Sequence, residues 1–267
     1  MLEMEFVLGA PDPEMRRIAA ILEQLGRTFT WATKGGKPIS PSDAYKIDSA
    51  NADDAHTLVY VECFPKVRPT RPIIQIDHHR PGDHGFHLSP EDYLMGSSLG
   101  QTLNLLKLKP SHDDREMAAM DHCFAAAMRG ECPGVTQEDV LFLAVQETAK
   151  STGVHMLDVW QRIHEFAQKL ERAPPIRIGK QDVTDLRRVE LGDGYSPDFL
   201  AARIAAANEG YGVLLRRRSH GGGVMKTVLS GHLSPSTVRY FIETWARENG
   251  LHHPYGAETR EFAGAYE

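Results

Sequence analysis

The sequence has few cysteines, with only Cys63, Cys123 and Cys132 among 267 residues. They form no CxxC pair and cannot all be paired within one chain, so the fold does not depend on disulfides and a reducing compartment is indicated. The sequence also lacks any run approaching the roughly 18 apolar residues that a membrane-spanning helix needs. Residues 1–15 carry acidic side chains instead of the basic and apolar regions of a signal peptide. We therefore expect a cytoplasmic protein with no membrane partner.

An excess of positive charge is also absent. The 30 Lys and Arg residues are outnumbered by 36 Asp and Glu residues, which gives a formal net charge of −6. A surface that binds bulk duplex nucleic acid is normally basic, so such a partner is not expected. A phosphate-bearing ligand would instead be held locally, by a metal ion or a few cations. The 41% of hydrophobic residues is typical of a folded protein with one large or two smaller domains.

Short apolar runs alternate with helical patterns in the first half of the chain. The runs at 5–10, 57–64 and 72–76 predict strands, and apolar residues at helical spacing over 15–26 predict a helix after the first of them. A further helix is expected from about 90 to 109. Strands that alternate with helices favour βαβ units and a parallel sheet.

Acidic and histidine side chains follow each of the three runs. They are Asp12 and Glu14, then Glu62, then Asp77, His78 and His79. Because ligands of parallel sheets bind beyond the carboxyl ends of the strands, we expect these side chains to converge. Carboxylates with imidazole suit a divalent cation such as Mn²⁺, Mg²⁺, Fe²⁺ or Co²⁺, and Glu62 could bridge two ions about 3.5–4 Å apart. The competing interpretation, acids that cap loops, explains each group alone but not their shared position.

The second half of the chain changes character. Helical patterns cover 113–129 and 137–171, and the two prolines of 171–180 then indicate a linker. A helix at 196–208, strands at 211–218 and 225–231 and a last helix at 235–249 follow. We therefore predict an α/β domain at 1–170 and a smaller α+β domain at 181–267, with a cleft between them.

A glycine-rich turn joins the two strands predicted in the second domain. The candidate phosphate-binding residues in and around it are Arg216, Arg218, His220, Gly221, Gly222, Gly223 and Lys226. Glycines let backbone amides approach an anionic group closely, and the arginines and lysine would supply charge. Taken alone, the segment also fits an ordinary hairpin turn with solvated arginines.

The segment IDHHRPGD (76–83) resembles the motif that names the DHH phosphoesterase superfamily. That group includes short-oligonucleotide exonucleases, cyclic-dinucleotide phosphodiesterases, single-strand DNA exonucleases and manganese pyrophosphatases. GSSLGQTL (96–103) resembles the small-residue helix start that follows the motif, and HGGGVMKTVLSG (220–231) resembles the glycine-rich substrate loop of the associated C-terminal domain. The resemblance implies an α/β fold with an N-terminal parallel-sheet DHH-like domain and a C-terminal DHH-associated α+β domain.

The resemblance also implies a set of metal ligands. They are Asp12, Glu14, Glu62, His78 and Asp121, with His122 as an alternative beside the last. Manganese is the first choice, with magnesium or cobalt possible, as one or two ions. The family motif HxxPDxD aligns with LGAPDPE, so Leu8 stands where a histidine ligand is expected. Glutamate replaces aspartate at positions 14 and 62, and His84 is a substitute ligand held in reserve.

The implied catalytic residues are the three of the DHH motif. Asp77 would orient a histidine, His78 would bind metal and His79 would contact substrate phosphate. The leading hypothesis is a metal-dependent phosphoesterase that hydrolyses a phosphodiester or phosphoanhydride bond in a small nucleotide, such as a short oligonucleotide or cyclic dinucleotide. A homodimer is the candidate assembly. The alternative, favoured by Leu8, is a degenerate DHH fold that binds nucleotides or a protein partner without catalysis. A third reading is an unrelated α/β enzyme with a chance DHH.

Overall fold

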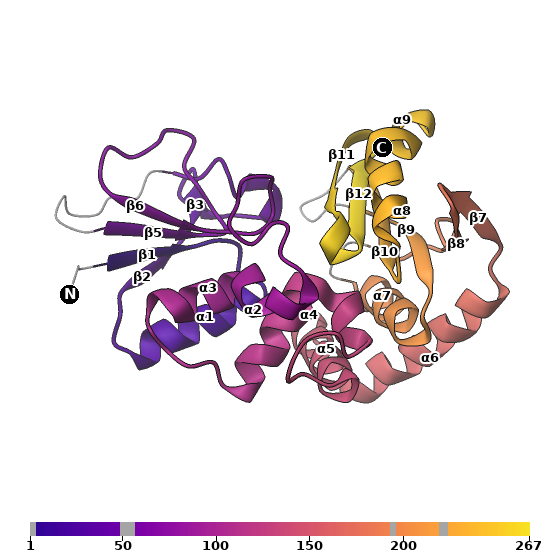
Figure 1. Ribbon diagram of the computed structural model, residues 1–267, viewed down its shortest axis with the longest axis horizontal. Helices are drawn as coiled ribbons and strands as arrows, with labels where there is room; N and C mark the ends of the chain where they lie inside the picture. The colour runs from indigo at the N-terminus through magenta and orange to yellow at the C-terminus, as the bar shows by residue number, and fades with distance from the viewer. Residues whose placement is uncertain (1–3, 49–56, 193–195, 219–223) are drawn as a thin grey trace. The chain divides into compact units, whose positions relative to one another are not determined.

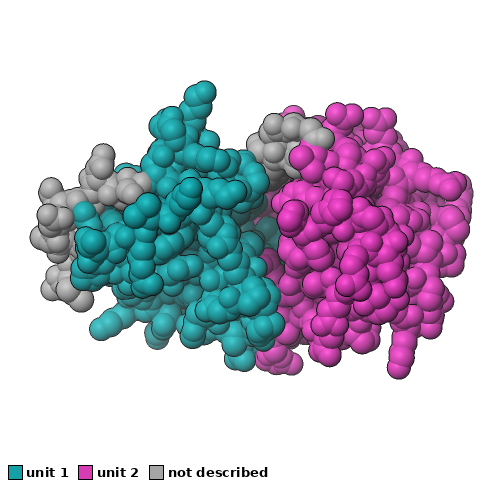
Figure 2. All heavy atoms as spheres, turned by 90° about the horizontal axis from the view of Figure 1, so that it is seen from above, with its two compact units in different colours: residues 1–88, 92–121 teal, residues 89–91, 122–267 magenta. Residues whose placement is uncertain are grey.

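The computed structural model describes residues 4–48, 57–192, 196–218 and 224–267. Two compact units make up the chain, one from residues 1–88 and 92–121 (unit 1) and the other from residues 89–91 and 122–267 (unit 2), coloured separately in Figure 2. Unit 1 contains a parallel sheet, and unit 2 contains a larger mixed sheet. The predicted α/β architecture with a second, separate sheet is therefore confirmed.

The sheet of unit 1 has the strand order β2-β1-β5-β6, and all its neighbours run parallel. The strands are β1 (Met4–Leu8), β2 (Phe29–Trp31), β5 (Thr57–Val61) and β6 (Ile73–Ile76). The central strands β1 and β5 contain buried apolar runs, residues 6–8 and 58–61, because both faces of a parallel sheet are covered. Val7, Leu58 and Tyr60 pack with residues of the segment 32–47 on one face. Helices α1 (Pro13–Gln24) and α3 (Ser98–Leu105) lie along the sheet in Figure 1.

Two polar residues fix the starts of the helices that border the strand ends. Asp12 caps α1, with its Oδ1 accepting a hydrogen bond of 2.8 Å from the Met15 amide. Ser97 caps α3 by accepting from the Gly100 amide at 2.9 Å. The single helix expected over 90–109 is therefore divided at Ser97, between α2 (Tyr93–Gly96) and α3. Gly100 permits this tight turn, because a Cβ there would lie 1.7 Å from the Leu94 carbonyl oxygen.

The remaining elements of unit 1 are short, except for one helix shared with unit 2. They are β3 (Thr33–Lys34), β4 (Lys37–Pro38), η1 (Pro41–Asp43) and α4 (His112–Met128), while the short η2 (Pro90–Asp92) has its first two residues in unit 2. Helix α4 crosses from unit 1 into unit 2 after Asp121. Its backbone is not helical at Cys123, where φ is −147° and ψ is 59°. The division between the units thus lies next to a break in this helix.

Unit 2 is built on a six-stranded sheet in the order β11-β12-β10-β9-β8-β7. Its strands are β7 (Pro175–Ile178), β8 (Gln181–Asp185), β9 (Gly212–Arg218), β10 (Met225–Gly231), β11 (His252–Ala257) and β12 (Phe262–Tyr266). Its helices are α5 (Gln137–Thr152), α6 (Met156–Arg172), α7 (Pro197–Glu209), the consecutive α8 (Pro235–Tyr240), η3 (Phe241–Trp245) and α9 (Ala246–Glu248), and η4 (Glu258–Arg260). Leu214, Leu229 and Ala263 of the sheet pack against Phe241 and Trp245.

The segment expected as a linker, 171–180, contains the end of α6 and all of β7. Its prolines therefore begin an edge strand, where the missing amide of proline is tolerated. The domain boundary at this segment stays a prediction, while the compact units divide after residue 121. The apolar C-terminal segment forms β12, which pairs with β10 and β11 in the sheet.

Among the described residues, no helix combines the length and the hydropathy that crossing a membrane requires.

Candidate metal centre

Four side chains of unit 1 form a compact cluster near the carboxyl ends of the parallel strands. They are Glu14, Glu62, His78 and Asp121, and each offers a ligand atom within 4.8 Å of the others. Strand β5 leads directly to Glu62, and β6 leads to the Asp77–His79 segment. Glu14 lies in the first turn of α1, and Asp121 comes from α4. The parallel sheet thus brings together residues that are more than a hundred positions apart.

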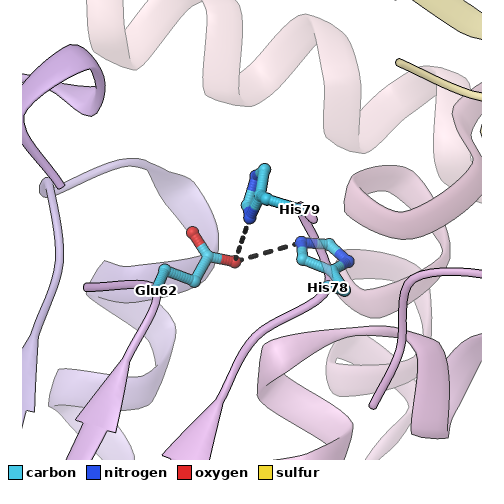
Figure 3. Close-up of side chains that lie close together, drawn as sticks. All are labelled: Glu62, His78 and His79. Carbon is cyan, nitrogen blue, oxygen red and sulfur yellow. Dashed lines mark ion pairs between the residues drawn. The ribbon is translucent and has the colours of Figure 1, made fainter. Parts of the chain in front are cut away.

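The imidazole of His78 lies between two carboxylates. Its Nε2 is 3.1 Å from Glu62 Oε1 and 3.1 Å from Asp121 Oδ2, and its side chain is fully buried. Figure 3 shows a ring nitrogen of His78 and one of His79 directed at the same oxygen of Glu62. His79 is looser, with Nδ1 3.9 Å from Glu62 Oε1 and 42% of its side chain exposed. Glu62, His78 and His79 form a second, overlapping group of potential ligands.

The backbone of Glu62 has a φ of 51°, in the left-handed region that residues with a side chain rarely adopt. Such strain is kept where the surroundings fix it, and it is frequent at functional sites. The carboxylate accepts a hydrogen bond of 2.9 Å from the Ser98 hydroxyl at the start of α3. Burial acts to raise the pKa of Glu62, but the two histidines outweigh it and lower that pKa below its ordinary value. Glu62 is therefore held ionised.

The surroundings of Glu14 raise the pKa of its carboxyl, whereas those of Glu62 lower it. Its side chain is 1% exposed, and Oε1 accepts a hydrogen bond of 2.8 Å from the Leu99 amide. Oε2 is buried and has no hydrogen-bond partner among the described residues. Burial, followed by the charges of Asp121 and Glu62, raises the pKa of Glu14 well above its ordinary value. A buried carboxylate oxygen without a hydrogen bond is unfavourable, and so is the repulsion from the two neighbouring carboxylates. A cation bound here would relieve both of these costs.

Asp12 borders this cluster without joining the four residues. Its Oδ1 is engaged by the Met15 amide as the cap of α1. Burial and the nearby Glu62 and Asp121 carboxylates raise the pKa of Asp12 well above its ordinary value. The concentration of negative charge therefore extends from Asp121 to the start of α1.

The donor set of three carboxylates and one imidazole fits a hard or borderline divalent cation. The unsatisfied Glu14 Oε2 and the mutual repulsion of the carboxylates are structural signs in favour of such an ion. Asp77 is not among these ligands. It is 1% exposed, and its Oδ1 accepts from the amides of His78 at 2.8 Å and His79 at 3.1 Å. It therefore fixes the loop that carries both histidines.

Three residues considered as ligands lie outside the cluster. Leu8 is fully buried in β1, paired with Val61 of β5, and an aliphatic side chain cannot bind a metal. His84 is exposed and belongs to no group of potential ligands in the described part of unit 1. His122 is buried and belongs to unit 2, whereas its neighbour Asp121 is in the cluster. Neither histidine is grouped with the four side chains among the described residues, so a ligand role for His84 or His122 stays a prediction.

The predicted phosphate-binding residues belong to unit 2. Arg216 is engaged by Glu267, with its Nε and Nη2 2.6–3.0 Å from the carboxylate oxygens. The Lys226 ammonium lies 4.5 Å from the centroid of the Tyr266 ring, and Arg218 is exposed on β9. His220, Gly221, Gly222 and Gly223 lie outside the described residues. The role of this whole group stays a prediction.

Several contacts of the cluster carry no signal in a single sequence. They are the Ser98 hydroxyl on Glu62, the Leu99 amide on Glu14 and the Glu267 carboxylate on Arg216. The small-residue segment 96–103 was the only indication of the first two. The third joins residues that are 51 positions apart, one on β9 and the other just after β12, with β10 between these strands in the sheet.

Gly85 offers a test of how tightly His78 is held. A Cβ at position 85 would lie 2.2 Å from the Gly96 carbonyl oxygen and 2.8 Å from the Cβ of His78. We expect Gly85→Ala to lower stability by about 1–3 kcal/mol, as overpacking does, and to weaken Mn²⁺ binding by moving His78. Denaturant unfolding and isothermal titration with Mn²⁺ measure the two effects, with Gly82→Ala as the control. Gly82 has open space around its would-be Cβ but a φ of 101°, so its variant strains the backbone without crowding His78, and it should bind Mn²⁺ like the wild type.

No protein-family model matches the chain, and a search of the curated proteins finds no match. A comparison with solved structures finds similarity to a pGpG-specific phosphodiesterase, PggH, from Vibrio cholerae. The similarity covers 99% of this chain and 92% of that one, with a TM-score of 0.40 and 9% sequence identity.

Proposed function

We propose that the chain is a metal-dependent phosphoesterase of the DHH type, which hydrolyses a phosphodiester or phosphoanhydride bond in a small nucleotide. The observation that carries the proposal is the buried cluster of Glu14, Glu62, His78 and Asp121. Three carboxylates around one imidazole, one of them with an unsatisfied oxygen, are costly to bury unless a cation binds there. Manganese is our first choice of ion, with magnesium or cobalt as alternatives.

A bound divalent cation would polarise a phosphoryl oxygen. It would also lower the pKa of a water molecule bound to it toward neutrality. The residues of the chain would do the rest. Glu14, Glu62, His78 and Asp121 would hold the ion, and Asp77 would keep the histidine loop in place. His79, with its half-exposed ring, would contact a non-bridging phosphate oxygen. Arg216, Arg218 and Lys226 of unit 2 are proposed to supply further positive charge for phosphate.

One ion per chain is the stoichiometry we expect. Leu8 removes a ligand from the first ion of the family arrangement, and the four clustered residues suffice for one ion. Metal analysis of protein that has been dialysed against Mn²⁺ and desalted measures the ratio. Two ions per chain would mean that Asp12 or His79 completes another site, and no bound ion would favour the alternative of a non-catalytic nucleotide-binding protein.

The activity is tested by a hydrolysis screen with Mn²⁺. The substrates are the linear dinucleotide pGpG, a short oligonucleotide, a cyclic dinucleotide and pyrophosphate, with EDTA-treated protein as the control. We expect turnover of one class that EDTA abolishes and Mn²⁺ restores. No turnover of any class by protein that binds Mn²⁺ would overturn the catalytic proposal. A cytoplasmic location and a homodimer stay predictions.

A further inference from the structure

We infer that Tyr45 is a positioning residue that holds Asp77, and through it the ring of His79, in the orientation needed for phosphate contact. Tyr45 carries no sequence signal of function. Its hydroxyl donates a hydrogen bond of 3.0 Å to Asp77 Oδ2. The inference rests on the proposed function, because it deepens the role given there to His79.

The two oxygens of Asp77 have different tasks. Oδ1 receives the amides of His78 and His79 and also lies 3.0 Å from His79 Nδ1. Because Oδ1 accepts two backbone amides and Oδ2 accepts the Tyr45 hydroxyl, the group acts as a carboxylate, which only accepts. His79 Nδ1 must therefore carry the proton of this hydrogen bond. Nε2 is the nitrogen left to face the substrate, and it must carry a proton to donate to a phosphate oxygen.

The other oxygen, Oδ2, has Tyr45 as its described hydrogen-bond donor. Without that donor, the carboxylate would be held through Oδ1 alone, and rotation about its last bond would shift Oδ1 from its alignment with the three N–H groups. A buried carboxylate oxygen without a donor is also unfavourable. The Tyr45 hydroxyl thus fixes the plane of the Asp77 carboxylate, and that plane fixes the ring of His79.

Tyr45 is itself held in place from two sides. Its ring packs against the buried cluster that contains Val7, Leu58 and Tyr60. The guanidinium of Arg80, the residue after His79, stacks over the ring. Burial, followed by the Asp77 charge, raises the pKa of Tyr45, so the hydroxyl keeps its proton and remains a donor. A rigid, protonated donor is what positioning a carboxylate requires.

The test removes the hydroxyl alone. In Tyr45→Phe we expect kcat for the substrate found in the screen, with pGpG as the first probe, to fall about ten- to a hundredfold, because misplacing a reacting contact costs about this much. KM should stay within about twofold, and the affinity for Mn²⁺ should not change. Tyr240→Phe is the matched control, because Tyr240 lies on α8 of unit 2 and is not a described hydrogen-bond partner of Asp77.

A second measurement does not depend on catalysis. Imidazole ¹⁵N spectra of histidine-labelled protein, with His79 assigned by His79→Gln, should show a single Nδ1-protonated form of His79 in the wild type. Tyr45→Phe should show a mixture of forms. If Tyr45→Phe keeps both the wild-type kcat and the single form, the positioning role is wrong. If the wild type hydrolyses nothing, the proposed function fails while the spectra still decide the role of Tyr45.

Discussion

The His78→Ala variant is expected to lose at least about a thousandfold in kcat on the substrate found in the screen. His78 Nε2 lies 3.1 Å from both Glu62 and Asp121, so the ring is the only nitrogen ligand in the four-residue cluster. Its removal leaves three carboxylates without the imidazole between them and weakens the hold on the ion. Losing a group that organises transition-state charge typically costs about a hundred- to a thousandfold, and losing the ion costs more.

The control for this variant is His87→Ala. His87 lies in the same segment, nine residues later, but it is exposed and belongs to no group of potential ligands in the described part of unit 1. Because His78 is buried, replacing it with alanine could also disturb the fold. His78→Gln is therefore measured too, since glutamine fills more of the space left by the ring but binds a metal ion poorly. Thermal unfolding of the metal-free proteins checks the fold. Hydrolysis at the wild-type rate by folded His78→Gln, still stimulated by Mn²⁺, would remove His78 from the site.

The sequence predicted the parallel sheet because its strands carry strong local signals. Apolar runs ended by acids at Glu62 and Asp77 mark both the strand and its carboxyl end, and the structure places β5 and β6 there. The convergence of Glu14, Glu62 and His78 follows from the parallel arrangement itself. Asp121 could be reached only through the family resemblance, because nothing local distinguishes it from other acids on a helix.

The missed features depend on contacts between segments that are distant in the chain. Ser97 divides a helix that the apolar pattern alone makes continuous, and the division puts the Ser98 hydroxyl and the Leu99 amide onto the acidic cluster. Tyr45 reaches Asp77 across 32 positions. The first strand of the mixed sheet, β7, was hidden by its prolines, which locally indicate a linker. In each case contacts between distant segments determine where the element or hydrogen bond forms, so local sequence propensity could not predict it.

The Glu14→Gln variant is expected to change stability in opposite directions with and without metal. Burial and the charges of Asp121 and Glu62 raise the pKa of Glu14 in the folded state. The pKa of such a carboxyl is higher in the folded protein than in the unfolded chain, where it is roughly 4.3. Its contribution to stability is fully present below the pKa of the unfolded chain and is lost as the pH rises through the pKa of the folded protein. Glutamine stays neutral, so the variant avoids this loss. Its amide can still accept from the Leu99 amide and can donate to a neighbouring carboxylate.

For the metal-free proteins at pH 8 we therefore expect Glu14→Gln to be more stable than the wild type, by about 1–3 kcal/mol, the usual cost of an unsatisfied buried group. The gain should disappear near pH 4, where Glu14 is neutral in both states. Denaturant unfolding in EDTA at several pH values measures this dependence. Glu23→Gln, an exposed position on the same helix, should show no such gain at any of them.

Addition of Mn²⁺ should reverse the order of the two proteins. Ligand that binds only the folded state adds about 2.7 kcal/mol of stability at a hundred times its dissociation constant, and the wild type alone should gain this fully. In Glu14→Gln one of the three carboxylate ligands is neutral, so we expect the Mn²⁺ affinity to fall at least about a hundredfold and hydrolysis to fall with it. A variant that is less stable than the wild type in EDTA would show that the acidic cluster is not strained. One that binds Mn²⁺ like the wild type would show that Glu14 is not a ligand, because the charge lost at this position must be felt by any cation held between Glu14, Glu62 and Asp121.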